Sequence, residues 1–443
     1  MSIPKLVTPY WSSNTEGELL VGGATISDLA DRYGTPLFVY DQGVVERKYL
    51  ALRNSLPGRF AISYSVKANP NPAFLRFFLD RGCGLEIASA GEFHLARSVD
   101  CPPEKIIFAG PGKTEAELRL VISEGIGEIH LESTLEIDRI SAISRAAGHR
   151  TRVALRVNPN EESQGGAIRM GGKSAPFGVD EELIDPLILR ISKDPHLEFC
   201  GIHLFSGTQV LDHTLLLDQY RKGFEIGRRA AALVSAPLQT LDLGGGLGIP
   251  YFPNDSELNL HQFGIGLLAL LDHAREEVFA NTQFVLEPGR FLVGETGVYV
   301  TRITDIKASR GKTYLIMDGG MNHHLAACGN LGQVIKRNFP MTIVNKLDLP
   351  DIDAVDVVGP LCTPLDTLGR AVHLPRAEVG DLLGIFQSGA YARTASPLGF
   401  LSHPSPPEVW VDDGCDFLIR RRGSTDDFVR DIQALGMPLR SNP

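Results

Sequence analysis

The sequence predicts an α/β fold, a TIM-type (β/α)8 barrel with a C-terminal β-rich domain of barrel or sandwich type. Three observations predict it. Eight short β-rich segments alternate with helix-like segments between residues 61 and 290, and the first five start 22–24 residues apart. After about residue 291 the helix-like segments give way to closely spaced strands. A spacing of 22–24 residues is that of one strand-plus-helix unit, which a parallel barrel repeats eight times.

The predicted barrel strands are short runs of apolar and β-branched residues at 61–68, 84–89, 106–112, 128–133, 152–159, 199–207, 239–246 and 283–290. The segments between them have helical features. "NPAFLRFFLDRG" carries apolar residues at three-four spacing, and "TEAELRLVISEG" starts on a Thr cap and ends on Gly. The last three intervals are roughly twice as long, which indicates insertions in those loops. We therefore expect the barrel to span residues 36–290.

The remainder of the chain predicts a second domain rich in strands. Six strand-like segments, from "GVYVTRITDIKA" to "DFLIRRRG", follow one another with turn residues between them. The first 35 residues precede the barrel pattern, so we expect residues 1–35 and 291–443 to form this domain together.

Composition narrows the class of protein. The chain has 443 residues, a net charge of −10 and 43% hydrophobic residues, and no apolar run reaches the ~20 residues of a membrane span. An acidic chain disfavours nucleic acid or an anionic membrane as the main partner. Residues 1–17 lack the pattern of a secretory signal, and the six cysteines are scattered. We expect a cytoplasmic protein without disulfides.

Unusual residues gather where the predicted barrel strands end. Lys67 ends the first strand, "HLFSG" the sixth, "GGG" the seventh and "EPGR" the eighth. Each has an ordinary structural interpretation: a surface lysine, a buried histidine, a tight turn, a loop charge. The C-terminal ends of barrel strands, however, lie on one face, and that face carries the chemistry of these barrels.

One cofactor, pyridoxal 5′-phosphate (PLP), would use all four sets. It needs an amine for a covalent bond to its aldehyde, a phosphate cradle, a partner for its ring and a group facing its ring nitrogen. Lys67 supplies the amine, and His203 can stack on the ring. Ser206 and the backbone amides of Gly244, Gly245 and Gly246 can bind phosphate. Glu287 can keep a proton on the ring nitrogen.

The ordered motifs "YSVKAN", "EIASAGE", "GIHLFSG", "LDLGGGLGIPY", "EPGR", "GPLC" and "SGAY" resemble the PLP-dependent decarboxylases built on the alanine-racemase-type barrel. That group includes the diaminopimelate, ornithine and arginine decarboxylases. "DGGMNHHLAA", "VVGPLCTPLD" and "QSGAYARTASP" are most similar to decarboxylases of exosortase gene clusters and to the butirosin-pathway enzyme, which acts on an amino acid tethered to an acyl carrier protein.

The resemblance implies further roles. Glu287 faces the ring nitrogen where the related racemases have Arg, which favours decarboxylation. Cys362 of "GPLC" returns a proton to the substrate from the second subunit, and this implies a homodimer with shared active sites. The remaining implied cofactor contacts are Pro288, Gly289, Arg290, Tyr391, Arg156, Glu86 and Glu92. Implied substrate contacts are Asp366, Thr363, Arg290 and His323. His323 and His324 are adjacent in a strand and point to opposite faces, so we predict no metal site there.

The sequence departs from the diaminopimelate pattern at the distal end of the substrate. Three polar contacts of those enzymes correspond here to Thr363, Ala326 and Asn330. Losing buried hydrogen-bonding partners reduces discrimination steeply, so a free diamino diacid fits poorly. A substrate tethered to a carrier fits better, because its arm supplies binding energy away from the reacting carbon. Acidic carriers would require a basic docking patch, and the candidates, which are otherwise ordinary surface charges, are residues 221–229, 336–337 and 420–422.

Alternatives to a decarboxylase for a tethered amino acid stay open at this stage. They are a decarboxylase for free diaminopimelate, ornithine or lysine, a PLP racemase, and a non-catalytic regulator. Glu287 and Cys362 disfavour the racemase. Retention of Lys67, Glu287 and Cys362 disfavours the regulator.

Overall fold

The computed structural model describes residues 3–160, 168–169, 174–205, 207–273, 277–329 and 336–432. The chain divides into two compact units. The barrel unit comprises Gly43–Thr296 and Gly389–Tyr391, and the β unit comprises Met1–Gln42, Gly297–Ser388 and Ala392–Pro443. Among the described helices, none combines the length and apolar character that a bilayer crossing requires.

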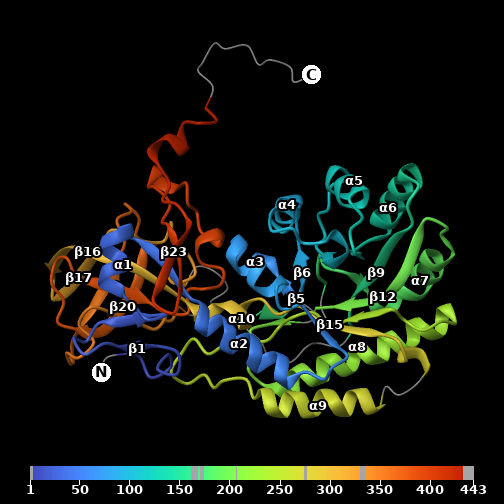
Figure 1. Ribbon diagram of the computed structural model, residues 1–443, viewed down its shortest axis with the longest axis horizontal. Helices are drawn as coiled ribbons and strands as arrows, with labels where there is room; N and C mark the ends of the chain where they lie inside the picture. Colours follow the sequence, from blue (N-terminus) through green and yellow to red (C-terminus); the bar gives the residue numbers. More distant parts are fainter. Residues whose placement is uncertain are drawn as a thin grey trace. The chain divides into compact units, whose positions relative to one another are not determined.

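Eight parallel strands close into a ring in the barrel unit, which confirms the predicted TIM-type fold (Figure 1). In order around the ring they are β5 (Phe60–Ser65), β6 (Gly84–Ile87), β7 (Ile106–Phe108), β8 (Glu128–Leu131), β9 (Thr151–Asn158), β12 (Leu197–Leu204), β14 (Thr240–Asp242) and β15 (Gln283–Leu286). The ring closes where Phe284 of β15 pairs with Phe60 of β5. Most strand residues are buried, as expected for strands covered on both faces.

Helices follow the strands and cover the outside of the ring (Figure 1). They are α2 (Gln42–Ser55), α3 (Pro72–Leu79), α4 (Ala90–Ser98), α5 (Glu115–Ser123), α6 (Thr134–Ala147), α7 (Ile184–Lys193), α8 (His213–Val234), α9 (Leu260–His273) and the short α10 (Arg290–Val293). Helix α5 starts with the predicted Thr114 cap, which forms a reciprocal capping box with Glu117. Minor strands β10 (Ile168–Arg169), β11 (Val179–Asp180) and β13 (Gly207–Thr208) lie in the longer loops.

The β unit contains the predicted second set of strands. They are β4 (Leu37–Asp41), β16 (Gly297–Ser309), β17 (Lys312–Met317), β18 (Met341–Ile343), β19 (Asp351–Val358), β20 (Thr367–Pro375), β21 (Leu382–Ile385), β22 (Glu408–Asp412) and β23 (Cys415–Arg420). The small sheet β1 (Ser12–Ser13), β2 (Leu19–Val21) and β3 (Ala24–Thr25) precedes helix α1 (Ile26–Tyr33). Trp11, Leu19, Ile26 and Leu29 pack with Val298, Val409 and other strand residues in one core, so the N-terminal residues do join this unit.

Two short segments lie on the other side of the predicted domain boundaries. Residues 36–42, expected in the barrel, belong to the β unit because β4 is hydrogen-bonded along both edges, antiparallel to β16 and parallel to β22. Residues 291–296, expected in the β-rich domain, belong to the barrel unit, where α10 continues directly from the end of β15.

Candidate active site

Lys67 lies just beyond the end of β5, in a 3-10 turn over Val66–Ala68. The predicted strand therefore ends two residues before the lysine. Its Nζ lies 3.1 and 3.0 Å from the two carboxylate oxygens of Glu86, which is buried on the neighbouring strand β6. The side chain of Lys67 itself is 43% exposed. The amine is thus ion-paired with Glu86, while part of the Lys67 side chain is exposed.

Neighbouring groups keep the Lys67 amine protonated in the free chain. Burial of the ammonium lowers the pKa of Lys67, but the charges of Glu86, Tyr391 and Glu287 raise it more, so the pKa lies above its usual value. The amine must lose this proton before it can attack an aldehyde. Glu86 is the carboxylate in contact with it.

The glycine triplet after β14 lies at a close approach of three strand ends. A Cβ on Gly244 would come within 2.4 Å of the Leu204 carbonyl oxygen, and one on Gly245 within 2.5 Å of the Glu287 carbonyl oxygen. Gly244 and Gly246 also have positive φ angles of 69° and 98°. Only glycine fits here without displacing backbone.

Four backbone amides at this end of the barrel have no protein acceptor among the described residues: those of Gly245, Gly246, Gly289 and Arg290. Pro288 instead uses its carbonyl to accept a hydrogen bond from the Ser65 amide. Gly245 is buried, and the other three residues are partly exposed. Backbone amides left without a protein acceptor at this end of the barrel are available to an anionic group such as phosphate. Ser206, also predicted to bind phosphate, lies outside the described residues.

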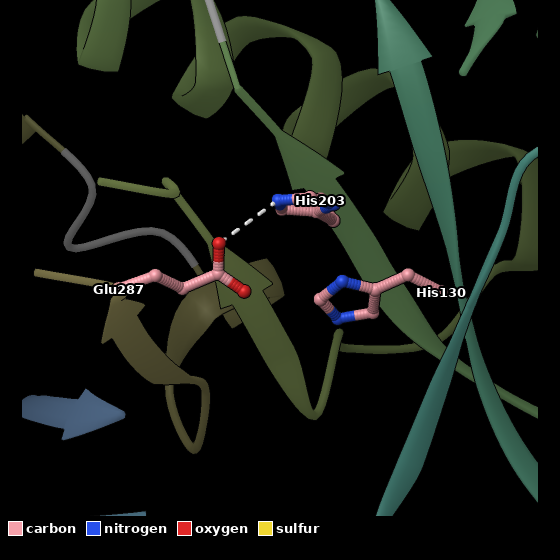
Figure 2. Close-up of side chains that lie close together, drawn as sticks. All are labelled: His130, His203 and Glu287. Atoms are coloured by element: carbon pink, nitrogen blue, oxygen red, sulfur yellow. Dashed lines mark ion pairs between the residues drawn. The ribbon is translucent and has the colours of Figure 1, made fainter. Parts of the chain in front are cut away.

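His203 on β12 and Glu287 after β15 point toward one another inside the ring (Figure 2). Nε2 of His203 lies 3.4 Å from Oε2 of Glu287. Both side chains are buried, yet neither ring nitrogen of His203 nor Oε1 of Glu287 has a hydrogen-bond partner in the part of the chain described. Burial, His130 and Arg156 lower the pKa of His203 well below its usual value, so the ring is neutral. A neutral ring and an unpaired carboxylate oxygen suit a flat heteroaromatic ligand with a protonated nitrogen.

Arg290 and Tyr391 meet beside Lys67. The backbone amide of Tyr391 donates to the Ala68 carbonyl at 2.8 Å, and its ring lies 4.8 Å from the Arg290 guanidinium carbon. Arg290 also donates to the Tyr251 hydroxyl at 2.9 Å, while its Nε has no partner within the described chain. The pair therefore places a cation and a phenol next to the turn that carries the lysine. Tyr251 was not singled out from the sequence, although it ends the quoted motif "LGGGLGIPY".

Arg156, predicted to line the cofactor pocket, is bound by a residue that the sequence did not single out. Its Nη1 donates to Glu132 at 2.7 Å, and the guanidinium lies 5.1 and 6.0 Å from the rings of Phe177 and Phe205. Glu132 also accepts backbone hydrogen bonds from Gly110 and Gly178. This carboxylate fixes the orientation of Arg156, and a role of Arg156 at the cofactor stays a prediction.

Four predicted residues lie in the β unit, and three of them are in the turn between β19 and β20. Cys362 is exposed and Thr363 is partly buried. Asp366 is buried, and its two oxygens accept backbone hydrogen bonds from Met321 and Leu361. His323 is buried against Asn322 and the Tyr299 hydroxyl. Asp366 therefore braces the turn that carries Cys362, and the substrate roles of these residues stay predictions.

The geometry of the site agrees with the comparisons with known proteins. Residues 42–294 match the sequence profile of the family described as "Pyridoxal-dependent decarboxylase, pyridoxal binding domain". The chain belongs to this family. It is a PLP-dependent decarboxylase, and the backbone amides without a protein acceptor in the described chain, the neutral His203 and the Glu287 oxygen without a described partner fit the cofactor.

Similar proteins align with this chain over almost its whole length. It is 36% identical over 409 residues to an L-glutamyl-[BtrI acyl-carrier protein] decarboxylase from Niallia circulans, covering 92% of this chain and 95% of that protein. It is 31% identical to a diaminopimelate decarboxylase from Aquifex aeolicus, covering 97% and 99%. A crystal structure of an Aquifex aeolicus protein superposes with a TM-score of 0.86 at 30% identity, covering 97% and 100%. The diaminopimelate decarboxylase of Helicobacter pylori with L-lysine gives 0.82 at 28%, covering 91% and 98%.

The buried side chain of Glu92 is expected to make the stability of the fold depend on pH. Burial raises the pKa of Glu92 to about 7, although an Ala88 amide hydrogen bond lowers it; the nearby Glu86 raises it further. A raised acid stabilises the fold only while protonated, so its contribution is present below pH 4.5 and is lost as pH rises through 7. A Glu92→Gln variant should therefore unfold like the parent at pH 4.5 and become more stable than it by up to about 3 kcal/mol at pH 8.

Denaturant unfolding of the cofactor-free protein at several pH values measures this difference. Glu124→Gln, on the exposed end of α5, is the matched control and should show no pH-dependent difference. If Glu92→Gln changes the free energy of unfolding equally at pH 4.5 and pH 8, Glu92 does not titrate in this range.

Proposed function

We propose that this decarboxylase removes the α-carboxylate of an amino acid that is attached through its side chain to an acyl carrier protein, with an L-glutamyl thioester as the first candidate. The observation that carries the proposal is the 36% identity over nearly the whole chain to an enzyme named for that substrate. A tethered substrate has no free distal charge, so the pocket needs no charged distal contact.

Two positions in the β unit support this substrate class. Ala326 is a buried small apolar residue, and Thr363 is an uncharged residue whose amide donates to the Leu361 carbonyl. The resemblance to diaminopimelate decarboxylases predicts polar or charged substrate contacts at both positions. The third such position, Asn330, lies outside the described residues. An enzyme selecting a free diamino diacid would leave that substrate's distal ammonium and carboxylate without these partners.

Each residue of the site has a separate role in the proposed reaction. PLP, when bound, supplies the electron sink that accepts the electron pair left at Cα after loss of CO₂. Lys67 would hold the cofactor through its amine, and Glu86, which contacts that amine, would take up and return its proton. Glu287 would hold a proton on the cofactor's ring nitrogen, and His203 would lie against its ring. Cys362 donates the proton that Cα requires once the carboxylate has left.

A homodimer with shared sites is part of this proposal. The resemblance places Cys362 of one subunit at the active site of the other, and the isologous symmetry of a dimer then completes two sites together. The exposure of the Cys362 side chain supports the proposal, because a proton donor for another subunit must be accessible.

The basic segments predicted for carrier docking are largely engaged within the chain. Arg221, Lys222 and Arg229 lie 2.5, 3.1 and 2.8 Å from Asp218, Glu181 and Asp185. Arg420 pairs with Glu408, Arg421 lies 3.4 Å from Asp427, and Arg422 donates to backbone carbonyls. Charges already paired attract an acidic partner weakly, so the printed ion pairs weaken residues 221–229 and 420–422 as candidates for carrier docking.

A free diamino acid is the second candidate substrate, favoured by the identity of about 30% to several diaminopimelate decarboxylases. The deciding experiment compares L-glutamyl carrier protein with free glutamate, diaminopimelate, ornithine and lysine. Mass spectrometry of the products would show loss of CO₂. We expect kcat/KM at least ~100-fold higher for the tethered substrate.

A carrier loaded with N-acetylglutamate is the matched control, because its blocked amine cannot displace Lys67. It should lose no CO₂. Turnover of free diaminopimelate with a kcat/KM of about 10⁴ M⁻¹s⁻¹ or more, without turnover of the loaded carrier, would contradict the tethered substrate.

A further inference from the structure

Four charged side chains form a buried network at the ends of three neighbouring barrel strands. Lys113 lies in the loop after β7, Glu132 directly after β8, Glu136 in the first turn of α6 and Arg156 on β9. Their side chains are between 1% and 8% exposed. Two positive and two negative charges balance one another, so the network is neutral as a whole. Buried charges are tolerated when they are paired and hydrogen-bonded, and these four meet both conditions.

Lys113 and Glu136 hold the end of β8 in place. Nζ of Lys113 donates to the carbonyls of Gly110 and His130, both at 2.7 Å. It also donates to Oε1 of Glu136 at 3.0 Å, and Oε2 of Glu136 accepts the backbone amide of Glu132 at 2.7 Å. All three Nζ protons and both carboxylate oxygens of Glu136 are therefore engaged. The backbone from which the Glu132 side chain projects is thereby bound to the loop after β7 and to α6.

The Glu132 carboxylate accepts hydrogen bonds on both oxygens. Its Oε1 accepts from Nη1 of Arg156 and from the Gly110 amide, both at 2.7 Å. Its Oε2 accepts the Gly178 amide at 2.9 Å. Burial raises the pKa of Glu132, but the charges of Arg156 and Lys113 lower it more, so the pKa lies below its usual value and the carboxylate is ionised at neutral pH. An ionised carboxylate bound to two backbone amides is a rigid partner for Arg156.

Arg156 is held through one of its nitrogens and lies beside His203. Among the described residues, Glu132 accepts from Nη1, and none accepts a hydrogen bond from Nε or Nη2. The rings of Phe177 and Phe205 lie 5.1 and 6.0 Å from the guanidinium carbon. Arg156 on β9 is paired with His203 on β12, which places the two side chains on the same face of the sheet. Two guanidinium nitrogens are thus left for a ligand next to the histidine that the cofactor ring is proposed to lie against.

We propose that Glu132 is a positioning residue for Arg156, which holds the guanidinium beside His203 so that Nε and Nη2 are directed at the bound cofactor. An arginine held in one conformation before its ligand arrives loses less conformational entropy on binding. The inference deepens the PLP-dependent function and rests on the cofactor-lining role predicted for Arg156. It does not depend on which amino acid the enzyme decarboxylates.

A cycle of single and double variants tests the coupling of Glu132 to Arg156. The cofactor is removed from the full-length protein, and the dissociation constant of PLP is measured from the change in absorbance as it rebinds. Glu132→Gln keeps the size of the side chain but presents an NH2 group to neighbours that are themselves donors. We expect it to raise the dissociation constant about tenfold, because the guanidinium loses its fixed partner.

The Arg156→Lys background shows whether this effect passes through the guanidinium. Lysine keeps the charge and can still pair with Glu132, but it lacks the two further nitrogens, so this variant alone should raise the dissociation constant about tenfold or more. Adding Glu132→Gln to it should raise the constant less than about twofold further, because Glu132 then has no guanidinium to direct.

Two outcomes would overturn the proposal. If Glu132→Gln changes PLP affinity by the same factor in both backgrounds, Glu132 acts on the fold and not through Arg156. If Arg156→Lys binds PLP as tightly as the parent, there is no cofactor contact for Glu132 to support. Glu132→Asp keeps the charge balance and withdraws the carboxylate by one methylene, and it provides the same cycle if Glu132→Gln does not fold.

Asp381→Asn is the matched control. Asp381 is also buried, lies 2.8 Å from Nζ of Lys346 and accepts the Glu378 amide, but it belongs to the β unit. The variant should lower the thermal stability and leave the PLP dissociation constant within about twofold of the parent. A tenfold loss of affinity here would mean that lost stability alone explains the effect of Glu132→Gln, against the proposal. Because no substrate enters these measurements, they stand or fall separately from the test with loaded carrier protein.

Discussion

A Lys67→Ala variant should lose the absorbance of the covalently bound cofactor and reduce kcat/KM by about 10⁴-fold or more. The Nζ atom of Lys67 lies just beyond the end of β5, 3.0 Å from Glu86. Without this amine the cofactor would lose its covalent attachment and would not be activated toward the substrate amine. Absorbance spectra of the purified protein and initial rates measure the two effects. Lys312→Ala, at an exposed ion pair on β17, is the control and should match the parent.

Residual turnover of Lys67→Ala could come from contaminating parent enzyme. Adding a small primary amine distinguishes the two, because the amine should raise the rate of the variant only. Partial rescue by the amine would be expected, since it can occupy the space of the lost side chain. A variant that keeps both the absorbance and the rate would show that another lysine binds the cofactor.

Two inactive variants should restore activity to one another. Lys67→Ala loses the amine of the barrel unit, and Cys362→Ala loses the proposed proton donor of the β unit. If each active site takes Lys67 from one subunit and Cys362 from the other, random re-assortment gives heterodimers with one intact site, and activity should return to about a quarter of the parent's. Rates before and after mixing under mild dissociating conditions measure this.

Mixing the double variant Lys67→Ala/Cys362→Ala with the parent is the control, because each heterodimer then has no intact site. Activity should fall below the amount of parent present. If the single variants mixed together stay inactive while gel filtration shows re-assorted dimers, the two residues act within one subunit.

The barrel could be predicted from the sequence because its strands are short buried runs at a regular interval. The positions of Lys67, His203 and Glu287 at or near strand ends could be predicted for the same reason, since each is a polar residue at the end of an apolar run. Their roles at the cofactor stay predictions. The exact place of Lys67 could not, since the turn at Val66 depends on contacts beyond the strand. Strands β18 and β20 were not predicted from the sequence. Strand β18 has only three residues, and strand β20 carries Arg370 and His373 among its apolar residues.

His130 and Glu132 were not singled out from the sequence. Each lies in or directly after the buried strand β8, and its partner comes from another strand: Glu132 binds Arg156 on β9, and His130 stacks on His203 of β12. A polar residue within a strand has no local signal that distinguishes a functional network from a satisfied core residue. Only the closed ring brings these side chains together.

The bond between Lys67 and the cofactor is tested most directly by reducing the holoenzyme with borohydride, digesting it and weighing the peptides. We predict that the peptide containing Lys67, and no other lysine peptide, gains the mass of one reduced pyridoxyl phosphate group. An unmodified Lys67 peptide from protein whose cofactor absorbance was bleached by the treatment would contradict it.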